Sequence, residues 1–276
     1  MLLYTCDVLM EKINYKKKYG QNFLYDENIL EKIVKSTNIN EDDLIIEIGP
    51  GSGNLTKKLQ IFNAQIIAFE IDETLSKQLK LIKNDKTKII FKDFLEVDLT
   101  EELKNIKYKN IYIIANIPYY ITTPIITKII NSKINPREII LMVQEEVTRR
   151  VVANETSPSK QYGLLTILSQ FWAECSIFRL VGRKSFYPAP KVNSALIYMK
   201  VRTEPLLKLS DYKHFRRTIK AAFSQRRKTL KNCLVSNGFS LEKVKEALKK
   251  LNLEENIRGE KLSIAQFGEL SELLLK

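Results

Sequence analysis

The sequence has very few of the residues that build the commonest metal and hydrolytic sites. His214 is its single histidine, which excludes a histidine-dependent catalytic triad and a zinc site made of several histidines. The three cysteines, Cys6, Cys175 and Cys233, are too far apart for a disulfide framework or a metal-ligand pair. No apolar run approaches the ~18–20 residues that cross a bilayer. We therefore expect a cytoplasmic protein that uses no metal and binds no membrane.

Acidic residues are also in the minority. The 276 residues contain 45 Lys and Arg against 32 Asp and Glu, a net charge of +13, and 44% of them are hydrophobic. This composition is typical of a globular protein with a polyanionic partner. Residues 1–15 lack the basic and apolar regions of a signal peptide. We expect them to be an N-terminal extension, with either Met1 or Met10 as the start of translation.

Short β-branched runs alternate with helical patterns over most of the chain, which predicts an α/β fold with a mostly parallel sheet. Residues 16–205 are therefore expected to form a nucleotide-binding domain. After this point the patterns are helical only, so residues 206–276 are expected to form a small basic domain. The expected strands are 44–48, 65–71, 87–91, 111–115, 138–143, 176–181 and 195–201, the last two paired as a hairpin around loop 183–191. One helix is expected to begin near Asn54. Further helices are expected over residues 73–83, 162–171, 212–223, 226–235, 241–251 and 263–274.

A row of residues suited to a nucleotide follows the first four expected strands. The glycine-rich loop 47–53 ends the first strand, and Glu70 ends the second, about 20 residues later, where a carboxylate typically accepts from ribose hydroxyls. Asp93 follows the third strand and Asn116 the fourth. Ligands bind along this edge of open α/β sheets. A nicotinamide-dependent dehydrogenase remains an alternative, although the loop lacks its sixth-position glycine. The loop residues expected at the ligand are Gly49, Gly51 and Gly53.

The tetrad Asn116-Ile117-Pro118-Tyr119 is suited to holding an exocyclic amino group. Asn116 offers a side-chain oxygen as acceptor and Ile117 a backbone carbonyl. Pro118 has a fixed φ and restricts the preceding residue to extended geometry. Tyr119 offers a flat face for stacking, worth roughly 1–3 kcal/mol per base in single-stranded sites. Two acceptors and a stacking platform favour adenine as the bound base.

Basic residues cluster in three segments. Residues 16–24 combine lysines with aromatic residues. Lys213, Arg217 and Lys220 follow helical spacing and share one face. A third cluster is expected to open the next helix, and phosphate contacts are the function that such clusters favour. The third cluster consists of Arg226, Arg227 and Lys228.

Five ordered motifs, from about Lys16 to the C-terminus, make this sequence resemble the bacterial small-subunit ribosomal RNA adenine N6,N6-dimethyltransferases. They are KKYGQNFL (17–24), EIGPGSG (47–53), NIPYY (116–120), FYPAPKVNSA (186–195) and AFSQRRKTL (222–230). The resemblance implies a class I S-adenosylmethionine-dependent methyltransferase: a Rossmann-like, seven-stranded sheet with a helical C-terminal domain. It also implies dimethylation of two adjacent adenosines near the 3′ end of 16S rRNA, in the assembling small subunit, by a monomeric enzyme.

The resemblance assigns roles to individual residues. The S-adenosylmethionine site would be lined by Asn22, Leu24, Gly49, Glu70, Asp93 and Asn116. Asn22 stands at a position where the family often has a histidine. The target base would stack on Tyr119, with Phe186 from the proline-rich loop over its other face. The basic clusters of residues 206–276 would bind RNA. Two other functions remain alternatives: a large-subunit rRNA methyltransferase of the macrolide-resistance type, and an RNA-binding assembly factor on the same scaffold.

Overall fold

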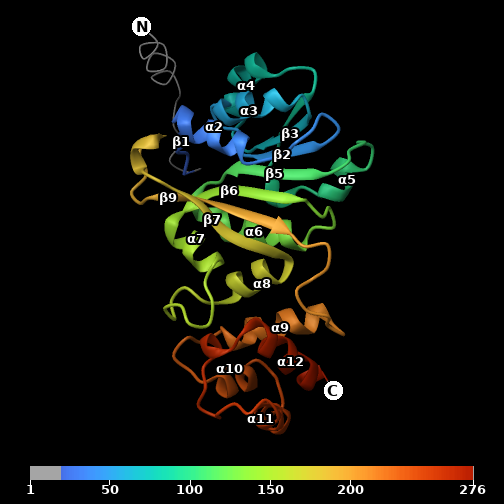
Figure 1. The fold of residues 1–276 in the computed structure, drawn as a ribbon, viewed down its shortest axis with the longest axis vertical. Coiled ribbons are helices and arrows are strands. Elements are labelled where there is room, and N and C mark those ends of the chain that lie inside the picture. Colours follow the sequence, from blue (N-terminus) through green and yellow to red (C-terminus); the bar gives the residue numbers. More distant parts are fainter. Residues whose placement is uncertain (1–19, 276) are drawn as a thin grey trace.

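The computed structural model describes residues 20–275. A sheet with its helices forms one end of an elongated molecule, and a group of helices forms the other end (Figure 1). The expected extension 1–15, with Cys6, and the basic residues 16–18 lie outside the described residues. Within residues 20–275, no helix combines the length and the apolar character that crossing a membrane requires.

A seven-stranded sheet organises the larger end of the molecule. Its strands are β2 (Leu44–Ile48), β3 (Gln65–Glu70), β4 (Thr87–Phe91), β5 (Ile111–Asn116), β6 (Glu138–Gln144), β7 (Ala173–Val181) and β9 (Ser194–Val201). Their order is β4-β3-β2-β5-β6-β9-β7. The first five of these are parallel, and β9 is antiparallel to both β6 and β7. The expected mostly parallel sheet with an antiparallel hairpin at one edge is confirmed.

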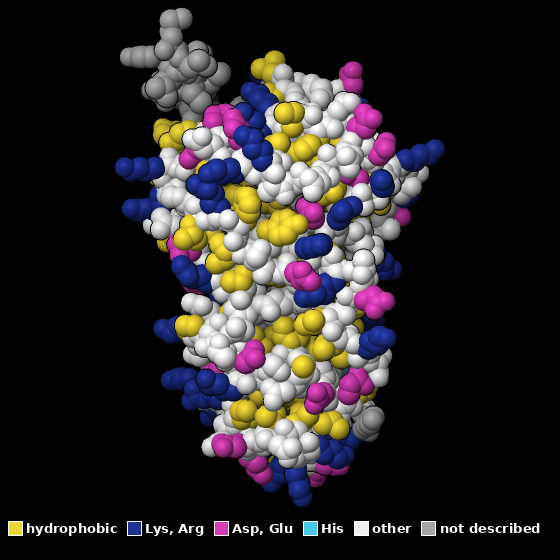
Figure 2. Space-filling model, in the orientation of Figure 1, with side chains coloured by type: hydrophobic (Ala, Val, Ile, Leu, Met, Phe, Trp, Pro, Cys, Tyr) yellow, Lys and Arg dark blue, Asp and Glu magenta, His cyan; other side chains and the backbone are white. Residues whose placement is uncertain are grey.

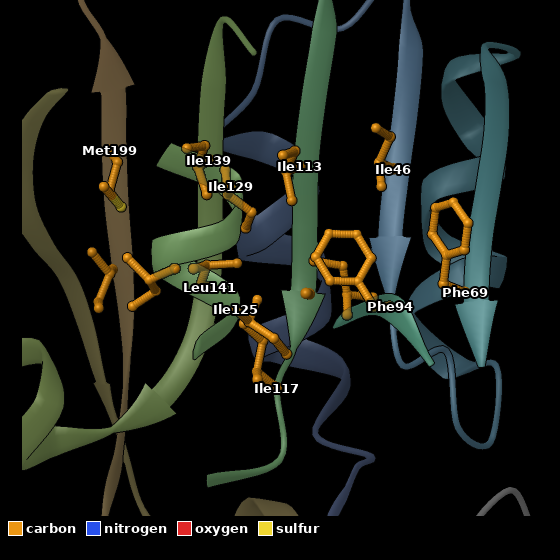
Figure 3. Close-up of a cluster of buried hydrophobic side chains, with 14 of the residues drawn as sticks. Ile46, Phe69, Phe94, Ile113, Ile117, Ile125, Ile129, Ile139, Leu141 and Met199 are labelled. Atoms are coloured by element: carbon orange, nitrogen blue, oxygen red, sulfur yellow. The ribbon is translucent and has the colours of Figure 1, made fainter. Parts of the chain in front are cut away.

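Helices cover both faces of the sheet because the strands are apolar on both sides. On one face, α2 (Glu27–Lys35) and α3 (Asn54–Leu59) pack against alternate residues of β2, β3, β5 and β6. On the other face, Ile46, Ile113 and Ile139 of neighbouring strands belong to the same buried cluster as Ile125 and Ile129 of α6 (Thr122–Asn131) (Figure 3). The remaining helices of this part are α4 (Ser76–Ile82), α5 (Leu99–Leu103), α7 (Glu145–Val151) and α8 (Leu164–Trp172).

Residues 20–24, here called the strap, cross the sheet edge where the parallel strands end. Strand β1 (Phe23–Leu24) lies in the strap and pairs antiparallel with β8 (Phe186–Tyr187) in the proline-rich loop. The Phe23 ring lies over the glycine-rich loop: a methyl group added to Gly51 would be 2.7 Å from it. The strap therefore covers the first turn of the sheet and joins it to a loop some 160 residues later in the chain.

The helical end contains α9 (Tyr212–Ala222), α10 (Leu230–Ser236), α11 (Leu241–Lys250) and α12 (Ile264–Leu275). Its hydrophobic core is continuous with one face of α8, which contributes Ile167, Leu168 and Phe171. The buried Tyr162 donates its hydroxyl hydrogen to the Leu262 carbonyl at 2.8 Å. Because α8 packs on the sheet with one face and on these helices with the other, it fixes the two parts relative to each other.

The structure corrects some expected elements. Helices α2, α5, α6 and α7 were not among the predicted elements, and the predicted helix 226–235 begins only at Leu230, with the Thr229 side chain accepting from the Asn232 amide as its N-cap. Arg226, Arg227 and Lys228 therefore lie in a turn before the helix. The reason is local: a threonine hydroxyl caps a helix end better than the preceding basic residues can.

Candidate active site

A cleft of about 900 Å³ of empty space, open to solvent, lies at the carboxyl ends of β2, β3, β4 and β5. This is the edge of the sheet where the sequence predicted a ligand. The structure brings together there almost the whole predicted row, from segments up to 94 residues apart. The predicted residues that line the cleft are Asn22, Leu24, Gly49, Gly51, Glu70, Asp93, Asn116, Ile117, Pro118 and Tyr119.

The glycine-rich loop turns through three left-handed residues, Gly49, Gly51 and Gly53, with φ values of 70°, 56° and 81°. Glycine is favoured where Gly53 lies because its φ of 81° strains any other residue, and an added methyl group would also displace the end of the Ile82 side chain. Gly53 itself lies behind the loop, against α4, rather than in the lining of the cleft. It supports the loop from below, while Gly49 and Gly51 face the open space.

Glu70 is tied to the glycine-rich loop. Its carboxylate accepts from the Gly51 amide at 3.0 Å and from the Asp72 amide at 2.9 Å, and the side chain is buried. Burial raises the pKa of Glu70 above its ordinary value, while backbone donors act in the opposite direction. Each oxygen uses one lone pair for the backbone, so a second lone pair on each can accept from a ribose hydroxyl.

Glu47, which sequence reasoning did not single out, lies under the same loop. It is fully buried on β2, and neither of its carboxyl oxygens has a hydrogen-bond partner among the described residues. The Thr56 hydroxyl is beside it but outside hydrogen-bonding geometry. Burial, with a smaller contribution from the nearby Glu70 carboxylate, raises the pKa of Glu47 to about 8. The only sequence signal was an acidic residue inside an apolar strand.

Asp93 lies half-buried at the end of β4. Its Oδ1 accepts from the Leu95 amide at 2.8 Å and so caps the short turn that follows. The cap fixes the side-chain direction, and Oδ2 is the oxygen that can accept from a nucleotide in the cleft. Phe94, next to it, is buried among the apolar residues of the sheet and also lines the cleft.

The side chain of Asn116 has a defined orientation. Its Nδ2 donates to the backbone carbonyl of Asn22 in the strap at 2.9 Å. A carbonyl oxygen can only accept, so it fixes which end of the amide faces the strap and leaves Oδ1 as the atom that can accept from a ligand. The contact uses the backbone of Asn22, whereas its side chain donates to the Gly20 carbonyl. Any residue at position 22 can therefore orient Asn116.

The rest of the tetrad is held by contacts on both sides. The Ile117 amide donates to the Met142 carbonyl at 3.1 Å, which fixes this residue beside β6. Pro118 has φ −56° and ψ 133°, and its φ lies in the narrow range that the proline ring imposes. Tyr119 opens a short 3₁₀ turn (Tyr119–Ile121), and its hydroxyl is 2.5 Å from the Ser194 hydroxyl.

Phe186, like Gly53, is a predicted site residue that does not line the cleft. Its side chain is only 2% exposed and packs in the core with Leu24 and Leu196, so it does not line the cleft. The prediction that its ring covers the target base is corrected. In the two-residue strand β8, side chains alternate between faces, and it is Tyr187, 43% exposed, that lies on the outer side.

The predicted RNA-binding residues are all exposed on the helical end. Two of them also contact other residues of the protein. The Arg217 guanidinium lies 4.7 Å from the centre of the Phe239 ring, and Arg226 donates to the Ser159 carbonyl at 2.9 Å. Figure 2 shows Lys and Arg side chains along both parts of the visible face, many of them at its left margin. The remaining predicted residues are Lys213, Lys220, Arg227 and Lys228.

Comparison with known proteins places this geometry in a family. The model of the family described as ribosomal RNA adenine dimethylase matches residues 12–276. A protein named ribosomal RNA small subunit methyltransferase A from Caldanaerobacter subterraneus is 41% identical, over 94% of this chain and 97% of its own. The protein of the same name from Lactococcus lactis is 40% identical, over 99% and 95%.

Solved structures agree. A dimethyladenosine transferase from Plasmodium falciparum has a TM-score of 0.73 at 25% identity, covering 90% of this chain and 95% of that one. The 23S rRNA methyltransferase ErmE has a TM-score of 0.67 at 24% identity and shows the same fold. The sheet described above is accordingly that of a class I methyltransferase. This chain belongs to the ribosomal RNA adenine dimethylase family.

Proposed function

We propose that this protein transfers methyl groups from S-adenosylmethionine to the N6 nitrogens of two adjacent adenosines in a stem-loop near the 3′ end of 16S rRNA. Full-length similarity to small-subunit methyltransferases supports the reaction and the substrate. The observation that carries the chemistry is the oriented amide of Asn116, whose donor end is engaged by the strap and whose acceptor end remains for a ligand.

The donor site is assigned to the row at the strand ends. Glu70 accepts from the ribose hydroxyls, Asp93 from the adenine amino group of the donor, and the Gly49–Gly51 turn allows close approach of the backbone. These groups fit a nucleoside because two acidic side chains and a glycine turn line one cleft. The bound donor supplies an electrophilic methyl group on a sulfonium. Asn22 and Leu24 contribute through the strap, whose Leu24 carbonyl is held by the Asn54 side chain at 2.9 Å.

The target nitrogen is a poor nucleophile, since its lone pair is delocalised into the purine ring. Asn116 Oδ1 and the Ile117 carbonyl accept its two N–H groups and favour a tetrahedral nitrogen whose lone pair is directed at the methyl group. Tyr119 stacks on the base, which has left its helix at a cost of a few kcal/mol. No strong base is required, because the nitrogen becomes acidic once alkylated. Positioning is the main source of rate.

The helical end, residues 206–276, is assigned to RNA binding. Arg227 and Lys228 lie exposed in the turn before α10, and Arg226 ties this turn to the loop after α7 through Ser159. Phosphate contacts orient an RNA and make its binding depend on salt. The matching partner is the immature small subunit, bound in the cytoplasm by a monomer of this chain.

A triple substitution tests this assignment. Replacing Arg226, Arg227 and Lys228 by alanine should weaken RNA binding at least about tenfold. The slope of log affinity against log salt concentration should fall by the amount that corresponds to roughly two to three lost phosphate contacts. Replacing Lys83, Lys86 and Lys104, which are exposed outside the helical end, by alanine provides a control of equal charge change. Equal losses in both variants would show that net charge, rather than this turn, determines affinity.

Methyl transfer itself is tested with labelled donor. Unmethylated small-subunit particles and large-subunit RNA are offered separately, and the label is located by digestion to nucleosides. We expect N6,N6-dimethyladenosine in the small-subunit particles. Label in large-subunit RNA alone would establish the resistance-type reaction instead, and binding without any transfer would establish an assembly factor.

A further inference from the structure

Ser194 lies in a fully buried position next to the proposed target site. It is the first residue of β9, 0% exposed, and β9 is paired on both sides there: Ser194 is in register with Gln144 of β6 and with Val181 of β7. The preceding residue, Asn193, accepts from the Glu145 amide at 3.1 Å. The backbone around Ser194 is therefore fixed by two separate segments of the chain, residues 144–145 and β7.

The Ser194 hydroxyl makes a contact that packing alone does not require. It is 2.5 Å from the hydroxyl of Tyr119, a residue 75 positions earlier in the chain that lies in a short 3₁₀ turn beyond the end of β5. Stacking on a base needs only an aromatic face, which phenylalanine supplies equally well. The phenol oxygen of Tyr119 instead reaches into the sheet, so the hydroxyl has a partner that determines where the ring lies.

We propose that Ser194 is a positioning residue for methyl transfer: its hydroxyl anchors the phenol of Tyr119 and so fixes the plane on which the target base stacks. The role rests on the function proposed above. It connects the two parts of the target site through one sheet, since Asn116 ends β5 and Ser194 begins β9, with β6 between them. The acceptors and the platform are thereby held at a constant distance from each other.

The contact persists at the pH at which the enzyme works. Burial raises the pKa of the Tyr119 phenol above its ordinary value, so that both hydroxyls are neutral in the physiological range and one donates to the other. The anchor is therefore a hydrogen bond between neutral groups, and removing either partner leaves the other without it. Removing both partners restores a consistent apolar contact.

The anchor matters more for the second methyl group than for the first. An unmodified adenine presents two N–H groups to Asn116 Oδ1 and the Ile117 carbonyl, whereas the monomethylated base presents one. With one of the two hydrogen bonds lost, the stacking plane determines a larger share of the base's position. A loosened Tyr119 should therefore slow the second transfer more than the first, and monomethylated adenosine should accumulate.

Four variants test the role: Ser194→Ala, Tyr119→Phe, the double variant, and Ser169→Ala as the matched control. Ser169 is equally buried, in α8, away from the cleft, and its hydroxyl has no partner among the described residues. Each is assayed on small-subunit particles for kcat, KM and the ratio of monomethyl to dimethyl product. The midpoint of thermal unfolding and the Kd for S-adenosylmethionine are measured alongside.

We expect Ser194→Ala and Tyr119→Phe each to lower kcat roughly two- to tenfold and to raise the share of monomethyl product, with an unchanged Kd for the donor. The double variant should be no slower than the slower single variant, and Ser169→Ala should match wild type. Tyr119→Phe leaves the sheet untouched, so it gives the answer even if Ser194→Ala folds poorly.

Two results would overturn the role of Ser194: a wild-type product ratio and kcat in Ser194→Ala, or losses in the single variants that multiply in the double variant. A wild-type enzyme that transfers no methyl group is a different result, because it refutes the proposed function itself.

Discussion

Glu47 gives the folded protein a pH dependence that can be calculated from its burial. Unfolded, its carboxyl group ionises near pH 4.5, whereas in the fully buried position the pKa is about 8. Between these pH values the folded chain holds a proton that the unfolded chain has lost. The stability that this proton contributes is therefore fully present below about pH 4.5. As the pH rises towards 8, the free energy of unfolding falls by about 1.4 kcal/mol per pH unit.

Replacing Glu47 by glutamine removes this decline. Glutamine has nearly the same shape and no charge. The free energy of unfolding of the variant should therefore rise relative to that of wild type by roughly 3 kcal/mol between about pH 5.5 and 7.5. The total rise should reach roughly 5 kcal/mol once the wild-type group is ionised. Glu70 still titrates in the variant. Its raised pKa results mainly from its own burial, so part of the pH dependence remains.

Urea unfolding at a series of pH values measures the effect, with the fluorescence of the single tryptophan, Trp172, as the signal. Glu101→Gln removes an exposed carboxylate that pairs with Lys104 and serves as the control. We expect its stability to follow that of wild type across the series. If the difference between Glu47→Gln and wild type is constant with pH, the carboxyl group is ionised in the fold and the reasoning from burial is wrong.

Two further substitutions test the strap. Gly51→Ala places a methyl group 2.7 Å from the Phe23 ring at a residue with a left-handed φ of 56°. We expect the affinity for S-adenosylmethionine, measured by calorimetry, to fall about tenfold or more. An affinity equal to that of wild type would mean that the strap does not close over the loop. Asn22→Ala should keep kcat within about threefold of wild type, because Asn116 contacts the backbone carbonyl of residue 22 and not its side chain. A fall in kcat beyond about thirtyfold in a methyl-transfer assay would assign a function to the Asn22 side chain.

The sheet could be predicted from the sequence because its strands are short, β-branched and separated by turn residues. The expected bounds of 44–48 and 87–91 are those of the structure, and the others differ by a few residues at their ends. α6 was missed although it is strongly apolar on one face. Its N-terminal turn contains Pro124, which reads as a loop signal in sequence but is tolerated in the first turn of a helix.

The site was harder to predict where it depends on distant contacts. The tetrad supplied the acceptors, but the orientation of the Asn116 amide comes from a carbonyl 94 residues earlier. Phe186 and Tyr187 are neighbours in a two-residue strand, so one must face inward, and only the pairing with β1 determines which. Motif resemblance transfers the identity of such residues but not the side of the strand on which they lie.

The contacts of the proposed site also show how substrates can be positioned without a histidine. Asn116 is fixed by the strap, Tyr119 by β9, and the strap by Asn54 at the start of α3. Each partner lies in a different segment of the chain, yet all of them belong to the same sheet edge or the turn beside it. A reaction that requires alignment rather than a base depends on rigid placement of acceptors, and backbone carbonyls and sheet residues provide it because they cannot rotate away. In the proposed mechanism, the catalytic geometry is thus a property of the completed sheet, and a change at any of these distant partners acts on the same target nitrogen.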